Sequence, residues 1–136
     1  LEYDECIKNM NEHNSSIVYV SQAPNQSDEV MTIGQSFELK TWNYVTGAVS
    51  NSNDIELNKN KKELKNLNVV CCDVLSDLAY IGLNTNEICV YSVRENKLIF
   101  SFFSYNDEAI IFLGGVKTSN ANYLIVVTRT SCILYQ

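Results

Sequence analysis

The chain's single histidine is the first place to look for acid–base or nucleophilic chemistry. His13 lies in the polar stretch NEHNSS, and no serine, threonine or cysteine stands at a spacing that pairs with it. A Ser-His or Cys-His mechanism needs the base within hydrogen-bonding reach of the nucleophile. We therefore expect His13 to be an exposed surface residue, and we predict no catalytic residue here.

The cysteines offer metal-binding or redox chemistry, but their spacing favours neither. Cys71, Cys72, Cys89 and Cys132 lie in apolar stretches, where cysteine usually acts as a small buried hydrophobic residue. A zinc site would need pairs such as C-x2-C, which adjacent cysteines do not supply. Five cysteines are an odd number for a disulfide framework, so reduced thiols in the cytoplasm or nucleus are expected. We predict no metal and no cofactor.

The carboxylates and the glycine pair also lack a catalytic pattern. Asp73 is the one ionisable residue in the apolar runs expected to lie innermost, and the other carboxylates are spread over turns. Gly114 and Gly115 follow an apolar run with no helix after them, so we predict a bulge or a close-packed contact rather than a phosphate loop.

Composition excludes several classes of partner. The chain is 46% hydrophobic, which is enough for a core, and it has 16 acidic and 10 basic residues, a net charge of −6. This negative field repels nucleic acid, and the only arginines, Arg94 and Arg129, are isolated. No apolar run approaches the roughly 20 residues that cross a bilayer, so membrane insertion is not expected.

Short apolar runs separated by turn-forming clusters predict an all-β, mainly antiparallel fold. The runs are rich in β-branched and aromatic residues, and no helix of crossover length separates them. Residues 1–15 and 50–66 are polar and are expected to be connecting segments. The predicted strands are residues 16–22, 29–34, 37–45, 68–75, 78–83, 87–93, 97–103, 109–116, 122–128 and 132–136.

A repeat connects these strands. Trp42 and Tyr91 are 49 positions apart, and Tyr91 and Tyr135 are 44 apart. The first two aromatic residues follow Gly34 and Gly82 at similar distances. Periods of this size are typical of repeat architectures, in which each unit packs on its neighbours.

The repeat unit LSDLAYIGLNTNEICVYS resembles the WD40 family of β-propellers, in which a strand, a turn with aspartate and a further strand precede a strand ending in Trp-Asp. Asp77 and Gly82 match the turn and the second strand. The pairs Trp42-Asn43, Tyr91-Ser92 and Tyr135-Gln136 stand where Trp-Asp would, and Tyr105 stands where the family has a turn histidine. We expect no unit to keep the family's hydrogen-bonded set of His, Ser/Thr and Asp.

The resemblance implies about three four-stranded blades, near residues 16–58, 67–104 and 109–136, with the last ending after its third strand. Family members use roughly four to eight blades. We therefore expect the chain to be the C-terminal part of a larger propeller, or to pair with another chain that supplies the rest. In such propellers the N-terminal segment commonly donates the missing outer strand. A β-sandwich whose strands recur by chance is the alternative fold.

The family implies a non-enzymatic scaffold in an intracellular multiprotein complex, such as chaperone-linked kinase assembly, ribosome biogenesis or a chromatin complex. Its partners would be other protein subunits, including the remainder of the propeller. Two alternatives remain: a propeller enzyme with a channel site, and an extracellular adhesion domain, in which the sequons at Asn14 and Asn25 would carry glycans. The expected partner-binding positions lie in turns and in the lysine-rich segment 59–65, because loops on a rigid scaffold carry recognition. Those in turns are Asn84, Glu87, Tyr105, Asp107 and Glu108.

Overall fold

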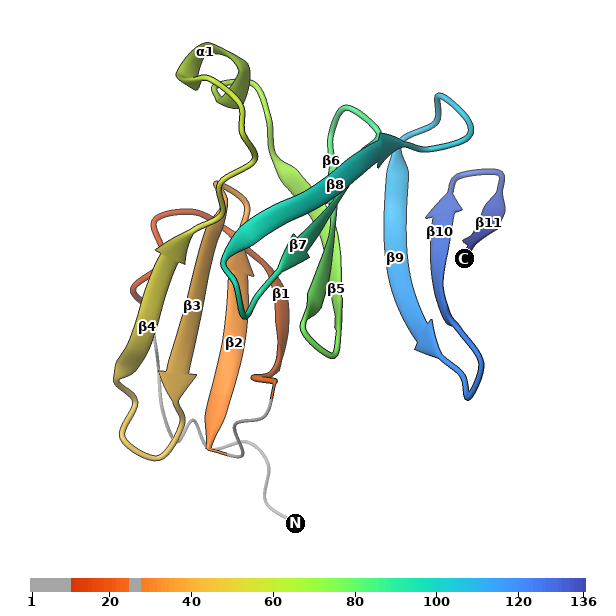
Figure 1. Cartoon of the computed structure of the whole chain (residues 1–136). Helices are drawn as coiled ribbons and strands as arrows, with labels where there is room; N and C mark the ends of the chain where they lie inside the picture. The colour runs from red at the N-terminus through yellow and green to blue at the C-terminus, as the bar shows by residue number, and fades with distance from the viewer. Residues whose placement is uncertain (1–10, 25–27) are drawn as a thin grey trace.

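The computed structural model describes residues 11–24 and 28–136, and these form three antiparallel sheets (Figure 1). Consecutive strands are neighbours in every sheet, so the all-β, antiparallel prediction is confirmed. Sheet A contains β1 (Ile17–Gln22), β2 (Glu29–Gly34), β3 (Glu38–Asn43) and β4 (Val49–Asp54). Sheet B contains β5 (Val69–Leu75), β6 (Leu78–Leu83), β7 (Glu87–Ser92) and β8 (Lys97–Phe103). Sheet C contains β9 (Ile110–Lys117), β10 (Asn122–Thr128) and β11 (Cys132–Tyr135).

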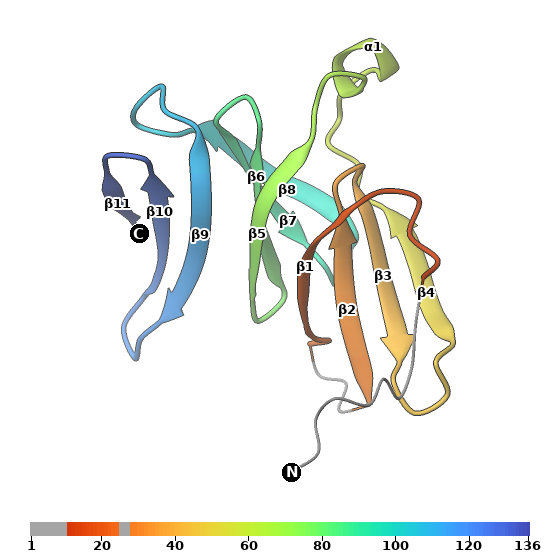
Figure 2. The same ribbon diagram turned by 180° about the vertical axis from the view of Figure 1, so that it is seen from behind.

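The first strands of the three sheets lie side by side. β5 contacts β1 on one side and β9 on the other, and the sheets spread apart from this line of strands (Figures 1 and 2). The central sheet therefore packs on both faces, and unbroken apolar runs are typical of strands buried in this way. Three sheets in sequence are incompatible with the two stacked sheets of a β-sandwich.

Two core layers separate the sheets. Along β6 and β7, alternate side chains face sheet A and sheet C, because successive residues of a strand point to opposite faces. The layer between sheets A and B includes Met31, Ile33, Leu39, Ala79, Ile81, Cys89 and Tyr91. The layer between sheets B and C includes Tyr80, Ile88, Val90, Leu113, Leu124 and Val126.

The three repeated aromatic residues occupy the same register. Trp42 is opposite Val30, Tyr91 is opposite Ala79, and Tyr135 is opposite Leu124. Tyr91 faces sheet A and Tyr135 faces sheet B, so each turns toward the preceding sheet. Trp42 lies on the face of sheet A opposite to Met31 and Ile33, the face turned away from sheet B.

The segment 50–66, expected to be a polar connection, instead begins with most of β4. This strand, VSNSND, has no apolar alternation because it is the outer strand of sheet A and most of its side chains are exposed. The remaining connection, residues 55–68, contains the single-turn helix α1 (Lys61–Leu64). Asn60 caps this helix by accepting a hydrogen bond from the Glu63 N–H at 2.8 Å.

Candidate functional site

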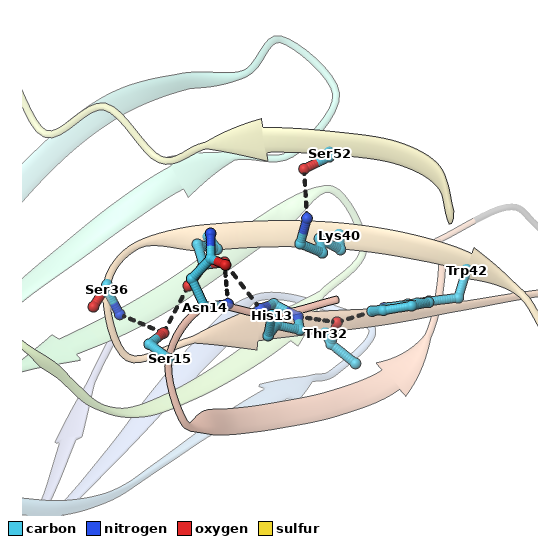
Figure 3. Close-up of polar contacts among 9 residues, drawn as sticks. His13, Asn14, Ser15, Thr32, Ser36, Lys40, Trp42 and Ser52 are labelled. Carbon is cyan, nitrogen blue, oxygen red and sulfur yellow. Dashed lines mark hydrogen bonds and ion pairs between the residues drawn. The ribbon is translucent and has the colours of Figure 1, made fainter. Parts of the chain in front are cut away.

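His13 is buried, so the prediction of an exposed histidine was wrong. Its side chain is 3% exposed, and its Nε2 lies 2.6 Å from the Thr32 hydroxyl on β2 (Figure 3). The indole N–H of Trp42 donates to the same hydroxyl at 2.7 Å. Sheet A thus contains a His–Thr–Trp hydrogen-bond chain, in which a glutamate, Glu38, and not an aspartate lies beside the histidine. The sequence did not reveal it because Thr32 lies 19 residues from His13.

Glu38 completes this cluster from the start of β3. Its carboxylate accepts hydrogen bonds from the Asn14 N–H at 3.0 Å and from the Ser15 hydroxyl at 2.7 Å. The Ser15 Oγ also accepts from the Ser36 N–H at 3.1 Å (Figure 3). These bonds fasten residues 13–15 to the hairpin between β2 and β3.

The electrostatics of the cluster keep His13 neutral. Burial lowers the pKa of His13, and this effect outweighs the opposing influence of Glu38, whose Oε2 lies 3.6 Å from Nδ1. Burial alone would raise the pKa of Glu38, but the hydrogen bonds from Asn14 and Ser15, together with the nearby His13 and Lys40, lower it. The Thr32 hydroxyl lies within hydrogen-bond distance of both His13 Nε2 and the Trp42 indole nitrogen, whereas the buried His13 Nδ1 has no hydrogen-bond partner among the described residues.

Gly34 makes the close packing of this cluster possible. A Cβ at this position would lie 2.8 Å from the Ser15 Oγ and 2.9 Å from the His13 Nδ1. Both hydroxyl groups of the cluster are used in internal hydrogen bonds, because that of Thr32 is buried against His13 and Trp42 and that of Ser15 donates to Glu38. The cluster therefore has a structural role. In the sequence, the glycine at position 34 of the repeat indicates its close packing.

Sheet B has a related ion pair at the matching position. Glu87 precedes Tyr91 by four residues, as Glu38 precedes Trp42. Its carboxylate is 3.1 Å from the Lys59 ammonium, and the residue is 7% exposed. Asn84, beside it in the turn, donates to the Asn66 carbonyl at 2.9 Å and accepts from the Asn68 N–H at 3.0 Å. Both residues therefore bond to the 55–68 connection.

Sheet C is fastened by Glu108. Its carboxylate accepts from the Thr128 hydroxyl at 2.8 Å, from the Thr130 N–H at 3.1 Å and from the Thr130 hydroxyl. The hydrogen bonds from Thr130 and Thr128 lower the pKa of Glu108. Tyr105 is 88% exposed and Asp107 is exposed, so these two remain surface residues in the described part of the chain. The Tyr105 N–H donates to the Tyr135 hydroxyl at 2.8 Å.

Asp73 joins all three sheets. Its Oδ2 accepts from the Gly115 N–H of β9 at 2.6 Å, and its Oδ1 accepts from the Tyr19 hydroxyl of β1 at 3.3 Å. The Tyr19 oxygen in turn accepts from the Val74 N–H at 3.2 Å. A Cβ at Gly115 would lie 3.0 Å from the Leu75 Cβ, so this glycine is the predicted close-packed contact. The one inner-strand carboxylate is thus bonded between neighbouring sheets.

The remaining repeat residues lie in turns and strand contacts. Asn43 Oδ1 accepts from the Val45 and Thr46 N–H groups at 3.0 Å, and Ser92 Oγ accepts from the Glu95 N–H at 3.1 Å. The Asp77 carbonyl accepts from the Val93 N–H at 2.8 Å. A Cβ at Gly82 would lie 2.7 Å from the Cys71 Sγ, so this position needs glycine for close packing.

The cysteines differ in exposure. Cys72 and Cys89 are buried and Cys71 is half-buried, whereas Cys132 on β11 is exposed, contrary to the expectation that it would be buried. Its edge strand leaves one face uncovered by described residues. Burial raises the pKa of Cys71 to about 11 and of Cys89 to about 12, so both remain protonated thiols at neutral pH.

Neither a metal site nor a membrane span emerges from the described residues. Within residues 11–24 and 28–136, no group of three or more His, Cys, Asp or Glu side chains is placed to hold a metal ion. The same residues contain no helix long and apolar enough to span a membrane. A pocket of about 700 Å³ lies between the β2–β3 hairpin and the 55–68 connection.

Comparisons with known proteins identify the architecture. No family model and no curated protein matches the sequence. Among solved structures, the RRP9 WD40 repeats superpose with a TM-score of 0.61 at 12% identity, covering 91% of this chain and 39% of that one. U3-55K gives 0.61 at 13% identity, covering 91% and 40%.

The C-terminal WD40 domain of Sif2 also gives 0.61 at 13% identity, covering 90% of this chain and 34% of that one. The chain therefore spans two-fifths or less of the length of each of these structures. The likeness in three dimensions, with the repeated aromatic positions, shows that the chain has the fold of three successive WD40-like β-propeller blades.

Proposed function

We propose that this chain is part of a non-enzymatic, WD40-like scaffold that holds other proteins in an intracellular multiprotein complex. The observation that carries the proposal is that ionisable side chains of the protein form hydrogen bonds within the chain. His13, Glu38, Asp73 and Glu108 all bond within the chain, where they fasten connections and neighbouring sheets. Side chains that bond within the chain stabilise a rigid framework. Partner proteins would then be bound by the exposed loops.

The free face of sheet C supports a second part of this proposal, that the remainder of a propeller completes the molecule. This face lies opposite to Leu113 and Val126, and it carries apolar side chains along all three strands. Phe112 is 54% exposed and Leu134 is 63% exposed. An exposed apolar sheet face of this kind marks an interaction surface. Further sheets, from the same polypeptide or from another chain, would cover it.

The proposed partners are protein subunits, and the proposed location is the cytoplasm or nucleus, where free thiols such as Cys71, Cys72 and Cys89 stay reduced. Complexes for kinase assembly with chaperones, ribosome biogenesis or chromatin are the kinds that the fold suggests. The acidic net charge of −6 supports protein partners over direct contact with nucleic acid.

Affinity purification of the tagged full-length protein from its own cells, with quantitative mass spectrometry, tests this function. We expect a reproducible set of proteins to co-purify at near-equal molar amounts, and to be absent when the tag alone is expressed. Recovery of the protein alone, after mild crosslinking as well as without it, would contradict the scaffold function. So would turnover of a substrate by the purified protein.

A further inference from the structure

The connection between sheets A and B is longer than the architecture requires. Residues 55–68 join the outer strand β4 to the first strand β5, and residues 104–109 make the equivalent link from β8 to β9. The first link has 14 residues and the second has 6. Connections of more than about 12 residues are uncommon in compact domains. Because six residues suffice for the same passage, the additional residues serve something other than the path between sheets.

These additional residues line a pocket together with the β2–β3 hairpin. The pocket has a volume of about 700 Å³, within the range of about 300 to 1,000 Å³ of ligand sites. Its apolar lining comes from both sides: Phe37, Ile55 and Leu57 are at most 7% exposed, while Leu64 and Leu67 are partly buried. An apolar side chain of a partner would therefore find an apolar surface there.

Two lining residues hold a backbone conformation that L-residues rarely adopt. Phe37 has a φ of 67° and Asn58 a φ of 56°. Asparagine tolerates this region, but a bulky residue such as phenylalanine adopts it at a cost in free energy. Asn86 holds the same conformation, with a φ of 66°, at the corresponding position before β7, so at Phe37 this conformation belongs to the hairpin turn that precedes β3. Here burial of the Phe37 ring and the hydrogen bond from the Ile55 N–H to the Phe37 carbonyl, 2.7 Å, hold it in place.

The charges around the pocket are unusual for this chain. Segment 59–65 carries four lysines and one glutamate, although the whole chain has a net charge of −6. Lys61 and Lys65 line the pocket and are exposed, and within the described residues they form no salt bridge. Lys59 is already paired with Glu87.

Asp54, the last residue of β4, and Glu56, which follows the strand, line the same pocket. The pocket therefore has carboxylates next to the strand and ammonium groups next to the helix. An acidic partner is attracted to the helix side and repelled from the strand side, which fixes one orientation.

We propose that this pocket binds an acidic peptide segment of a partner protein, with a large apolar side chain in the pocket and flanking carboxylates on Lys61 and Lys65. The inference rests on the proposed scaffold function and names the chemistry of one partner. The exposed lysines give electrostatic complementarity and faster association, while burial of the apolar side chain supplies the binding energy.

The test uses fluorescence anisotropy with the full chain and a fluorescein-labelled peptide in which Leu-Phe is followed, on one side only, by glutamates. We expect saturable binding that weakens at least about tenfold in the double variant Lys61→Glu/Lys65→Glu. Lys62→Glu is the matched control, because Lys62 is exposed on the same helix but does not line the pocket, and its affinity should stay within about twofold. A peptide with Ala-Ala in place of Leu-Phe should lose at least about tenfold.

Three results would overturn the proposal: no saturable binding, equal loss in Lys62→Glu and in the double variant, or equal binding of the Ala-Ala peptide. The first result would show that the pocket does not bind the peptide. The second would show that binding depends on the overall charge of the helix and not on the two lysines of the pocket. The third would show that the pocket does not bind an apolar side chain. A peptide with lysines in place of the glutamates repeats the charge test without altering the protein. If the peptide fails to bind while proteins still co-purify with the intact chain, the pocket proposal fails and the scaffold function stands.

Discussion

The carboxylate of Asp73 accepts a hydrogen bond from the backbone N–H of Gly115 across the boundary between sheets B and C, at 2.6 Å. The second carboxylate oxygen accepts from the Tyr19 hydroxyl of sheet A. A single side chain therefore bonds to the first strand of both neighbouring sheets. Hydrogen bonds to charged groups are among the stronger ones in proteins, so this position is a sensitive point of the framework.

We expect Asp73→Ala to lower the free energy of unfolding by about 2 to 4 kcal/mol, because it leaves the Gly115 N–H without its acceptor. Asp73→Asn should cost less, since its amide oxygen can still accept one bond. Urea unfolding followed by tryptophan fluorescence measures both. Asp107→Ala, at an exposed carboxylate, is the matched control and should change stability by less than about 0.5 kcal/mol. Equal stability of Asp73→Ala and the control would refute the role of this residue.

The buried His13 predicts a pH dependence of stability. Its pKa is lowered in the folded state from an ordinary value of 6.5, so the unfolded chain binds the proton more tightly. This contribution is complete above pH 6.5 and is lost as the pH falls from there through the folded-state pKa. Glu38 also has a lowered pKa, so its contribution is present above its ordinary value of 4.5 and is lost only at more acidic pH.

We therefore expect the free energy of unfolding to fall in two steps on acidification, and His13→Gln to remove the step that begins at pH 6.5 while leaving the one that begins at pH 4.5. Equilibrium unfolding in urea at half-unit intervals from about pH 2 to 8 resolves the two. An unchanged profile in His13→Gln would show that this histidine does not titrate differently on folding.

Gly34→Ala should destabilise the chain by about 1 to 3 kcal/mol, because the added methyl group would meet the Ser15 hydroxyl and the His13 ring within the cluster. Gly114→Ala provides the comparison. A Cβ there would lie 2.9 Å from the Phe112 ring, which is exposed and can turn away, so we expect a change below about 1 kcal/mol. Thermal unfolding by circular dichroism measures both, and a larger loss at 114 than at 34 would contradict this assignment.

Thiol reactivity should separate the described cysteines by their burial. We expect a thiol reagent to label Cys132 rapidly in the native protein, and to label Cys72 and Cys89 only after unfolding. Cys71 should be intermediate, since its raised pKa of about 11 limits the thiolate. Peptide mapping by mass spectrometry after timed alkylation gives the order. If native Cys89 reacted as fast as Cys132, the packing between sheets A and B would have to be looser than described.

The positions of most strands could be predicted from the sequence because the packing of this fold determines the local composition of each strand. Runs such as LAYIGL and EICVYS match β6 and β7 closely, since strands buried on both faces contain little except apolar residues. β4 was not predicted as a strand because an exposed edge strand rich in serine and asparagine has no such apolar run.

The His13 cluster could not be read from spacing, because it joins a residue before β1 to residues of β2 and β3 that approach only through the sheet register. Two signals pointed to it. One is Thr32, a hydroxyl residue inside the apolar strand EVMTIG, and the other is the glutamate four residues before both Trp42 and Tyr91. Polar residues that recur at one place in a repeat have a common structural cause.

The orientation of the repeated aromatic side chains gives the stack of sheets a direction. Tyr91 and Tyr135 each face the preceding sheet, so the two ends of the stack present unlike surfaces, with Trp42 on the outward face of sheet A and Phe112 on that of sheet C. Further sheets added at either end would therefore pack in the same head-to-tail order, as in heterologous assemblies. Two copies that met through identical ends would not reproduce the arrangement found between sheets A and B and between sheets B and C, in which an aromatic residue of one sheet faces the sheet before it.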